Sequence, residues 1–503
     1  MAGGSGERPD AGASASGVEQ LTAALVDARG VIGERDARIV ELEAELAAVR
    51  GDNAELRVRV EELAAAVAEL KQRLGQDSGN SSRPPSSEGL GKKPAQPRTR
   101  GGRRGKQPGT PGAHLAQVAD PDVVVDHVAA ACGGCGDGLD GAAVVGVARR
   151  QVFDLPQVSA HVVEHRVQRR RCGCGYVTAG EFPPEATAPA CYGPGVRAAM
   201  AYLQVAQHLP VARAAQLLSD LLGVPVATGA VAGVVGEAAE RVAPAVEQVR
   251  RLLAAAAVAH FDETGARVAG RLHWVHSAST AALTLLTVHA RRGQAAMDAA
   301  GVLPTFAGVA VHDCWSPYFS YATDHALCGA HLLRELTAAA ETGHDQQWAQ
   351  HLIDTLLTAK GWADTARAAG AAAIDADLLT ALAARYSGHL TQGRAANPAR
   401  RRRTTTQALI DRLDRRRDEV LRYTADLAAP FDNNQAERDV RMVKLQQKIS
   451  GGWRTLPGAQ AFCAVRSYIS TARKHGADIL TVLRDALTGK PWTPPTPALT
   501  IAA

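Results

Sequence analysis

Long apolar runs are absent from this sequence of 503 residues. The longest stretch of that kind, around "LLAAAAVA", is far short of the roughly 20 residues that a membrane-spanning helix needs. The first residues, "MAGGSGERPDAGASASG", contain no apolar segment of the type found in secretory signal peptides. We therefore expect a cytoplasmic protein that has no membrane partner.

Lysine is also scarce, since arginine outnumbers it 47 to 9. Together with much alanine and glycine, this skew indicates a GC-rich genome more than a special function. The net charge is only +5, but the basic residues are clustered, and clustering matters more for binding than the sum. With 46% hydrophobic residues, a chain of this length is expected to form roughly two to four domains with substantial cores.

Residues 18–75, after a disordered start at 1–17, repeat apolar side chains at alternating steps of three and four. Most core positions of one series are aliphatic, and leucine dominates the other, with Asn53 as a polar exception. The first series is Leu25, Ile32, Ile39, Leu46, Asn53, Val60, Val67 and Leu74, and the second includes Leu42, Val49, Leu56, Leu63 and Leu70. This combination favours a parallel two-stranded coiled coil. A single helix packed on its own protein is the alternative, but seven heptads are too long for it, so we expect a homodimer or higher oligomer.

Residues 76–113 form a basic linker rich in proline, glycine and serine, with eight lysines or arginines against one glutamate. Such a composition cannot bury a core, so we expect the linker to be flexible. It is either a soluble tether or an arm that contacts DNA phosphates. The "RGGRRGK" segment, with Arg103 and Arg104, favours DNA contact.

Four cysteines occur as two close pairs in the segment 114–186. "CGGC" supplies Cys132 and Cys135, and "CGCG" supplies Cys172 and Cys174. Without a secretory signal, such pairs favour metal binding over disulfides, and four thiolates suit tetrahedral Zn²⁺. A site closed by four thiolates leaves no position for water, so we expect a structural zinc-binding module. Unmetallated cysteines are the alternative.

Residues 190–256 have helical patterns that are interrupted at "GVPV". The two helices around this break are compatible with a helix-turn-helix that reads a DNA groove. Helices that pack without touching DNA are equally compatible, and the pattern does not separate the two interpretations.

Residues 257–475 carry the candidate catalytic acids. "AAVAHFDETGARV" predicts a strand that ends on Asp262 and Glu263, two more strands and a helix follow, and "FAGVAVHDCWSPYF" predicts a fourth strand with Asp313 near its end. This order is that of a ribonuclease H-like fold, in which paired carboxylates hold two Mg²⁺ ions at a phosphodiester. Mostly helical patterns follow up to Glu437, and a C-terminal tail is expected at 476–503. The fold class is therefore multidomain α+β.

The stretch "FDNNQAERDVRMVKLQQKISGGWRT" places a carboxylate, Glu437, on one helix face with Arg441, Lys444 and Lys448. A capping box between Asn434 and Glu437, followed by surface charges, explains the spacing without any site. Ligation of a metal by Glu437 is the functional alternative.

The motifs "HFDETGARV", "VHDCWSPYF", "CGAHLLREL", "DNNQAERDVRMVKLQQKISGG" and "YISTARKHG" together resemble those of bacterial transposases of the insertion-sequence-66 family. The resemblance runs from the zipper through the catalytic region. It implies that Asp262, Asp313 and Glu437 are an Asp-Asp-Glu triad, with Mg²⁺ or Mn²⁺ as cofactor. It also implies that the helical stretch at about 340–425 is an insertion before the helix that carries Glu437, and that two small accessory proteins of the same element are partners.

The resemblance makes a DNA transposase the leading hypothesis, acting on element ends and target DNA by two-metal phosphoryl transfer. On this hypothesis Arg441, Lys444 and Lys448 neutralise DNA phosphates. The alternative is a non-catalytic, dimeric, zinc-containing DNA-binding protein. A general nuclease would account for the acids but not for the zipper, linker and zinc module.

Several residues stay outside the predicted site. Glu263 is expected to face away from Asp262 because neighbouring strand residues alternate. His260 and His312 are expected to be packed or hydrogen-bonded. Cys328 and His331 in "CGAH" fit half of another zinc site and resemble a Cys-His motif found between the second and third acids of many such transposases. Since no second pair of ligands is clear, they are expected to pack or to support the site from behind. The arginine-rich stretches 400–403 and 412–418 fit DNA contacts and a solvated helix face equally well.

Overall fold

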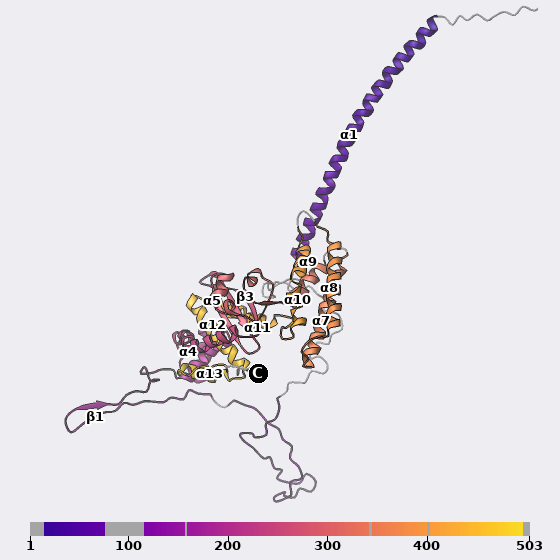
Figure 1. Ribbon diagram of the computed structural model, residues 1–503. Coiled ribbons are helices and arrows are strands. Elements are labelled where there is room, and N and C mark those ends of the chain that lie inside the picture. The colour runs from indigo at the N-terminus through magenta and orange to yellow at the C-terminus, as the bar shows by residue number, and fades with distance from the viewer. Residues whose placement is uncertain (1–14, 76–114, 156–157, 342–344, 400–402, 496–503) are drawn as a thin grey trace, which may run out of the picture.

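The computed structural model describes residues 15–75, 115–155, 158–341, 345–399 and 403–495 (Figure 1). Arg103 and Arg104, the predicted DNA contacts of the linker, lie outside the described residues, as do Arg400, Arg401 and Arg402. Among the described helices, none combines the length and apolar character that a membrane crossing requires.

A mixed five-stranded sheet lies at the centre of the fold, with strand order β5-β4-β3-β6-β7. Its strands are β3 (Val258–Val268), β4 (Arg271–Ser279), β5 (Thr284–His289), β6 (Val309–His312) and β7 (Asp324–Leu327). The first three are antiparallel neighbours, whereas β6 runs parallel to β3 and β7 runs parallel to β6. The central strand β3 therefore lies between an antiparallel and a parallel neighbour.

The predicted order of three strands, a helix and a fourth strand is confirmed, with α5 (Gln294–Ala300) as the helix. The prediction that the first strand ends at Asp262 and Glu263 is wrong, because β3 continues to Val268. Ala269 and Gly270, with φ of 49° and 75°, form a tight turn that pairs Val268 with Arg271 and extends the ladder. The short strand β7 was not predicted, since four residues give little alternation to recognise.

Two helices secure the sheet on one side. Helix α11 (Asn434–Ser450) packs across β3 and β4, and α12 (Leu456–Lys474) packs along β5. Ser467 and Thr471 of α12 accept hydrogen bonds from the backbone N–H groups of Leu286 and Thr284, at 2.8 and 3.1 Å. The edge strand β5 is thus covered and cannot pair with another chain.

The opposite face of the sheet is covered by α5 and by the short turns Leu303–Thr305 and Ser316–Ser320. Phe261 on β3 contacts the rings of Phe306 and Tyr318 there. Successive strand residues point to opposite faces, so His260 and Asp262 face the side of α11.

The helices α2 (Pro194–Ala201), α3 (Val211–Leu222) and α4 (Thr228–Ala254) share one hydrophobic core with the sheet and α12. Helix α4 lies along α12 and buries a stripe that includes Val242 and Val249. This is the packing that the second interpretation of residues 190–256 requires. The helix α13 (Ile479–Leu487), in the expected C-terminal tail, joins the same core.

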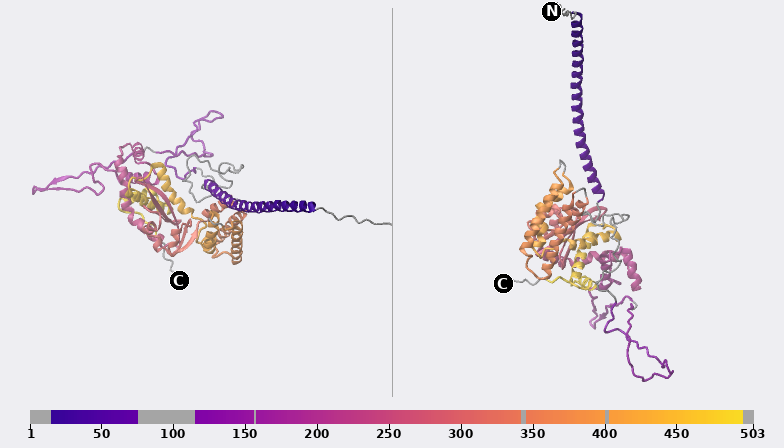
Figure 2. Two further views of the ribbon diagram at one scale, coloured as in Figure 1. Left: turned by 90° about the horizontal axis from the view of Figure 1, so that it is seen from above. Right: turned by 90° about the vertical axis from the view of Figure 1, so that its right-hand side faces the viewer.

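A helical subdomain separates β7 from α11, and it begins at Gly329, before the expected start of the insertion at about residue 340. Its helices are α6 (Gly329–Ala340), α7 (Gln347–Ala368), α8 (Ala376–Ala396), α9 (Thr405–Arg415) and α10 (Arg417–Ala425). They surround a hydrophobic cluster of their own, which contains the fully buried rings of Trp348 and Tyr386. In Figures 1 and 2 this orange group lies beside the sheet.

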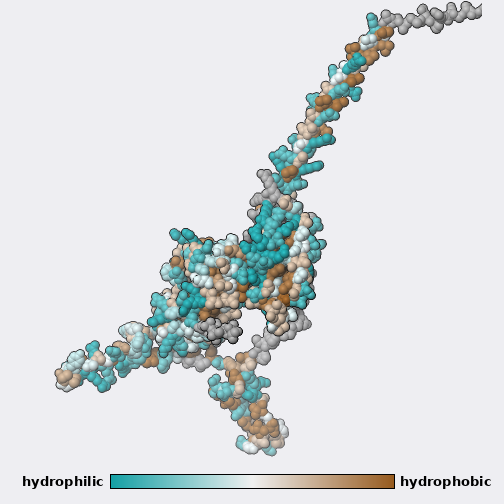
Figure 3. All heavy atoms as spheres, viewed as in Figure 1, coloured by the Kyte–Doolittle hydropathy of each residue, from teal (hydrophilic) through white to brown (hydrophobic). Residues whose placement is uncertain are grey.

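The predicted N-terminal helix is confirmed as α1 (Ala15–Gly75), which is 61 residues long and stands away from the rest of the chain (Figure 2). Its described core-position side chains are largely exposed, from 47% for Leu42 to 65% for Leu63. Figure 3 shows apolar side chains along this rod. Their burial requires a partner, and the coiled-coil pairing itself stays a prediction.

Residues 115–155 and 158–190 extend away from the helical body. The hairpin of β1 (Arg169–Arg171) and β2 (Val177–Ala179) lies in an outstretched arm (Figure 1). Hydrogen bonds between Val118 and Gln151 close a second loop. Many apolar side chains of the segment are exposed, among them Val124 at 72% and Val145 at 101%. The segment therefore buries little of a hydrophobic core.

Gly308, just before β6, should be intolerant of any side chain, because a Cβ there would collide with the carbonyl oxygens of Ala256 and Ala257. We expect Gly308→Ala to destabilise the fold by about 1–3 kcal/mol, the usual range for overpacking. The matched control is Gly361→Ala on the exposed side of α7, where a Cβ meets nothing within 4 Å. It should stabilise by about 0.5–1 kcal/mol. Thermal melts of the two variants measure both effects, and equal melting temperatures would contradict the packing at Gly308.

Candidate active site and metal centre

Asn433 fixes the start of α11 against β3. Its Nδ2 donates a hydrogen bond to the Phe261 carbonyl at 2.7 Å, and its Oδ1 lies 2.9 Å from His260 Nδ1. Its backbone N–H donates to Cys328 Sγ at 3.2 Å, and the residue is only 1% exposed. The helix that carries Glu437 is thereby held beside the strand that carries Asp262. His260 is hydrogen-bonded, as predicted.

The capping box proposed for the start of α11 is absent. The N-cap residue is Asn433 and not Asn434, and its side chain makes no capping hydrogen bond because it is bound to β3. The Asn434 N–H donates instead to Asp432 Oδ1 at 3.0 Å. Glu437 Oε1 lies 3.6 Å from His331 Nδ1 and from Arg334 Nη2. Capping therefore does not account for Glu437.

Asp262 lies on β3, and Asp313 directly follows β6, the parallel neighbour of β3. Asp262 Oδ1 accepts a hydrogen bond from the Glu263 N–H at 2.8 Å, and Asp313 Oδ1 accepts one from the Trp315 N–H at 3.0 Å. Burial raises the pKa of Asp262 well above its usual value, and the charges of Glu263, Asp313 and Glu437 raise it further. The three predicted acids therefore belong to one electrostatic cluster.

Glu263 faces away from this cluster, as predicted. Its Oε1 accepts hydrogen bonds from Arg292 at 2.9 and 2.6 Å, and its Oε2 accepts one from the Tyr318 hydroxyl at 2.6 Å. The Arg292 guanidinium also lies over the rings of Trp315, at 4.0 Å, and Trp274, at 4.9 Å. Since the Trp315 N–H donates a hydrogen bond to Asp313, the Glu263–Arg292 ion pair supports the loop that presents Asp313.

The basic residues of α11 do not share one environment. Lys444 is partly buried, and its Nζ donates to the Gly265 carbonyl of β3 at 2.7 Å. Burial lowers the pKa of Lys444. Arg441 and Lys448 are exposed. Of the three predicted phosphate contacts, Lys444 thus has a bond within the fold, whereas Arg441 and Lys448 face solvent.

An ion pair that the sequence did not reveal holds α11 to α12. Lys474 Nζ lies 2.9 Å from Asp439 Oδ2, and it also donates to the carbonyls of Thr280 and Leu283, both at 2.8 Å. Asp439 follows Glu437 by two residues on α11. The sequence showed Lys474 within the motif "YISTARKHG", but residue spacing could not predict that Asp439 is its partner.

His312 and the arginines of 412–418 have structural partners. His312 Nε2 lies 3.1 Å from His325 Nδ1, and both rings are buried, which confirms the packing predicted for His312. Arg412 pairs with Glu335, Arg416 with Glu419 at 2.8 Å, and Arg417 with Asp414 at 3.1 Å. The stretch therefore contributes to the helical subdomain through its own ion pairs.

Cys328, His331 and Glu437 form a group whose ligand atoms all lie within 4.8 Å of one another. Within the described part of the chain, it is the one group of three or more metal-ligating residues this close, so neither the three acids nor the four paired cysteines form another. Burial raises the pKa of Cys328 to about 11, while burial and then Arg334 lower the pKa of His331. Cys328 is buried, as predicted, but its nearness to Glu437 was not predicted.

The four paired cysteines lie in separate turns. The Cys132 N–H donates to the Asp137 carbonyl at 2.7 Å, and the Cys172 N–H donates to the Tyr176 carbonyl at 2.8 Å. Backbone N–H groups of Cys135 and Gly134 lower the pKa of the Cys132 thiol, and those of Cys174 and Gly173 lower the pKa of Cys172. Each turn thus favours a thiolate, although the structure does not bring the two pairs together.

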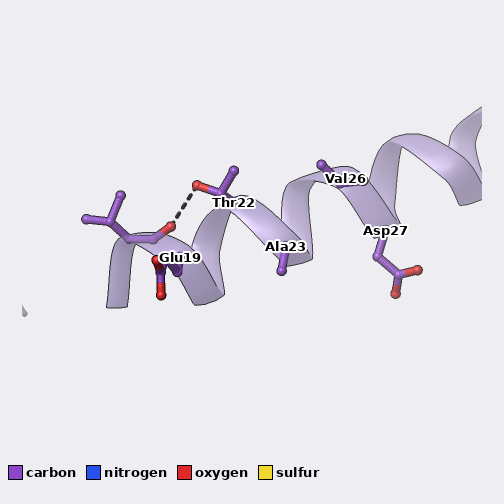
Figure 4. A pocket seen from close by; sticks show the side chains of 6 residues that line it. Glu19, Thr22, Ala23, Val26 and Asp27 are labelled. Atoms are coloured by element: carbon purple, nitrogen blue, oxygen red, sulfur yellow. Dashed lines mark hydrogen bonds between the residues drawn. The ribbon is translucent and has the colours of Figure 1, made fainter. Parts of the chain in front are cut away.

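A depression on α1 offers no comparable site. Figure 4 shows Glu19, Thr22, Ala23, Val26 and Asp27 along it, and Thr22 Oγ1 donates to the Val18 carbonyl at 2.7 Å. All of its lining residues belong to one helix. It is therefore a strip of helix surface and not an enclosed binding site.

A mixed sheet with an acidic cluster over its central strands defines an α+β protein with a polar site at the sheet. The chain belongs to the IS66 transposase family, whose model, described as "Transposase IS66 family", matches residues 189–461. That range contains Asp262, Asp313 and Glu437. The protein therefore belongs to a class of enzymes that cleave and transfer DNA, and DNA is its partner.

A second family model, described as a family of unknown function (DUF6444), matches residues 33–116. This range covers most of α1 and the basic linker. No curated protein matches the chain.

The raised pKa of Asp262 predicts that its carboxylate destabilises the folded, metal-free protein at neutral pH. Because the folded state holds this proton more tightly than the unfolded state, the free energy of unfolding falls as pH rises from the usual aspartate value towards the folded pKa. We expect Asp262→Asn to raise the melting temperature at pH 7 with a chelator present, and the gain to shrink near pH 4. The control, Asp122→Asn at an exposed position, should change neither value. A variant that melts below wild type at pH 7 would contradict the cluster.

Proposed function

We propose that the chain is an Asp-Asp-Glu transposase whose ribonuclease H-like domain cuts element ends and joins them to target DNA. The observation that carries this proposal is the convergence of Asp262, Asp313 and Glu437, which come from β3, the end of β6 and α11. The strand order and its mixture of antiparallel and parallel neighbours agree with the ribonuclease H-like fold predicted from the sequence. Family membership supports the same conclusion.

The donor set fits Mg²⁺ or Mn²⁺. Carboxylate oxygens are the ligands these hard ions prefer, and Asp262, Asp313 and Glu437 would hold them. Glu437 Oε1 is buried and has no hydrogen-bond partner among the described residues, as expected of an atom reserved for a ligand. Bound ions would activate a nucleophile and stabilise the leaving oxygen at a phosphodiester.

The protein's own residues position the reaction. Asn433 and the Lys474–Asp439 pair keep α11 in place, so Glu437 does not have to be ordered when DNA binds. Arg441 and Lys448 are exposed on the same helix and can neutralise phosphates. Water and then the freed 3′-hydroxyl attack phosphorus in turn, so no covalent bond between protein and DNA is needed.

The four paired cysteines and helix α1 would have structural roles in this transposase. Cys132, Cys135, Cys172 and Cys174 would bind one structural Zn²⁺, and this ion would draw together two arms that bury little apolar surface. The exposed seam of α1 would pair with a second copy, which makes the transposase a dimer or higher oligomer. By family resemblance, two accessory proteins of the same element would take part.

Loss of any acid should abolish cleavage without loss of DNA binding. Asp262→Asn, Asp313→Asn and Glu437→Gln each keep the size of the side chain and remove a charge that Mg²⁺ requires. We expect strand cleavage of DNA carrying the element ends to disappear, while gel retention without metal holds or improves because repulsion falls. The protein would be a non-catalytic DNA-binding protein if wild type also fails to cleave.

Glu263→Gln is the matched control for the triad. It removes a neighbouring carboxylate that bonds to Arg292 and Tyr318 on the other face of β3. We expect a lower melting temperature, since a buried ion pair is broken, but measurable cleavage. A Glu437→Gln variant that cleaves normally beside an inactive Glu263→Gln variant would overturn the assignment.

The isolated helix of residues 18–75 should associate with itself. Because its seam is exposed in one chain, the fragment should sediment as a dimer or larger at tens of micromolar, roughly the range expected for seven heptads. Asn53→Val should raise its melting temperature and broaden its oligomer distribution, since a buried asparagine fixes the register. A monomeric fragment would refute the pairing.

A further inference from the structure

We propose that Cys328, His331 and Glu437 form a separate binding site for a transition metal ion of the zinc class. The site shares Glu437 with the Asp-Asp-Glu cluster, and this shared role rests on the proposed function. The metal site itself rests only on the geometry of the three side chains.

The starts of two helices build the site. Cys328 is the N-cap residue of α6, and His331 is three positions later, so both lie on the same face of its first turn. Glu437 lies in the first turn of α11. The Gly329 N–H donates to the Phe431 carbonyl at 2.8 Å, and a Cβ at Gly329 would collide with the Phe431 ring. This close contact holds the two turns together before any ligand binds.

Two polar atoms face each other across the gap without a bond. His331 Nδ1 and Glu437 Oε1 are 3.6 Å apart, which exceeds hydrogen-bond distance. Both atoms are buried, and neither has a hydrogen-bond partner within the described residues. Such pairs are costly unless a ligand satisfies them. A cation between them would bind the nitrogen and the oxygen at once.

The donor set selects the ion. Thiolate sulfur and imidazole nitrogen suit Zn²⁺, whereas Mg²⁺ prefers oxygen donors and retains water. Three protein ligands leave a fourth tetrahedral position open for water or substrate. Binding forms a metal–sulfur bond and releases the Cys328 thiol proton to solvent. The Arg334 guanidinium, 3.6 Å from Glu437 Oε1 and partly exposed, is the group that the ion would displace.

Sharing of Glu437 makes this site antagonistic to the acid cluster. While Zn²⁺ holds the carboxylate, Glu437 is not available beside Asp262 and Asp313. Zinc should therefore inhibit Mg²⁺-dependent cleavage in wild type, and variants that lack Cys328 should resist the inhibition.

The decisive experiment measures zinc stoichiometry of the full-length protein by competition with a colorimetric chelator. We expect Cys328→Ser and His331→Gln each to bind one Zn²⁺ fewer than wild type. Cys172→Ser should lose a different ion, so the Cys172→Ser, Cys328→Ser double variant should lose both. Cys463→Ser, which places serine at another buried thiol, is the matched control and should leave the stoichiometry unchanged.

Unchanged stoichiometry in both Cys328→Ser and His331→Gln would overturn the site. If Cys328→Ser does not fold, as judged by its thermal melt, His331→Gln decides the question because its side chain is 14% exposed. The measurement is independent of cleavage. A wild-type protein that binds this zinc but never cuts DNA would refute the proposed function and leave the metal site intact.

Discussion

The hydrogen bonds of Asn433 are the constraint on which the site depends. One buried residue joins three elements: its side chain binds β3, its N–H binds Cys328 before α6, and its carbonyl accepts the Glu437 N–H of α11 at 3.3 Å. Each of these elements contributes a candidate ligand. An apolar residue at this position would leave the Phe261 carbonyl and the His260 ring without their partner, so the register between strand and helix would lose its anchor.

The acidic residues around the sheet differ in whether a cation is hydrogen-bonded to them. On the α11 side, burial of Asp262, and then the charges of Glu263, Asp313 and Glu437, raise the pKa of Asp262, and this cost destabilises the metal-free fold. On the opposite face, Glu263 is fully paired with Arg292 and Tyr318. Asp439, on α11 near Glu437, is paired with Lys474. Glu263 and Asp439 are hydrogen-bonded to cations and stabilise the frame. The Arg334 guanidinium lies 3.6 Å from Glu437, beyond hydrogen-bond distance, which leaves that carboxylate for a ligand.

The sequence was sufficient for the elements whose signals are local. Strand-like segments separated by turn residues predicted β3, β4 and β5, the apolar repeat predicted α1, and helical patterns predicted helices before Glu437. The alternation of strand residues between the two faces separated Glu263 from Asp262. Family resemblance, more than spacing, pointed to Glu437. The structure then excluded the capping box, because the side chain of Asn433 is committed to β3.

What the sequence could not provide depends on contacts between distant positions. His331 and Glu437 meet only because Gly329 packs against Phe431, and no periodicity encodes that approach. The Lys474–Asp439 pair is hidden for the same reason. The turn at Ala269 and Gly270 allows β3 to pair with β4 as far as Val268, and the positive φ of Ala269 is not predictable from its residue type. The proposed pairing of α1 would need a second chain, and the proposed gathering of the four cysteines would need an ion.

The meeting of Gly329 with Phe431 has a consequence for how this architecture is assembled. The chain leaves the sheet after β7 and returns to it at almost the same point, since these two residues share a hydrogen bond of 2.8 Å. The helices described between them, α6 to α10, surround a separate hydrophobic cluster. Such a loop with adjacent ends is the geometry of a domain insertion, in which the host sheet closes whether the guest is long or short. The helical subdomain can therefore change in length and surface over evolutionary time while the strands and α11 keep their mutual positions.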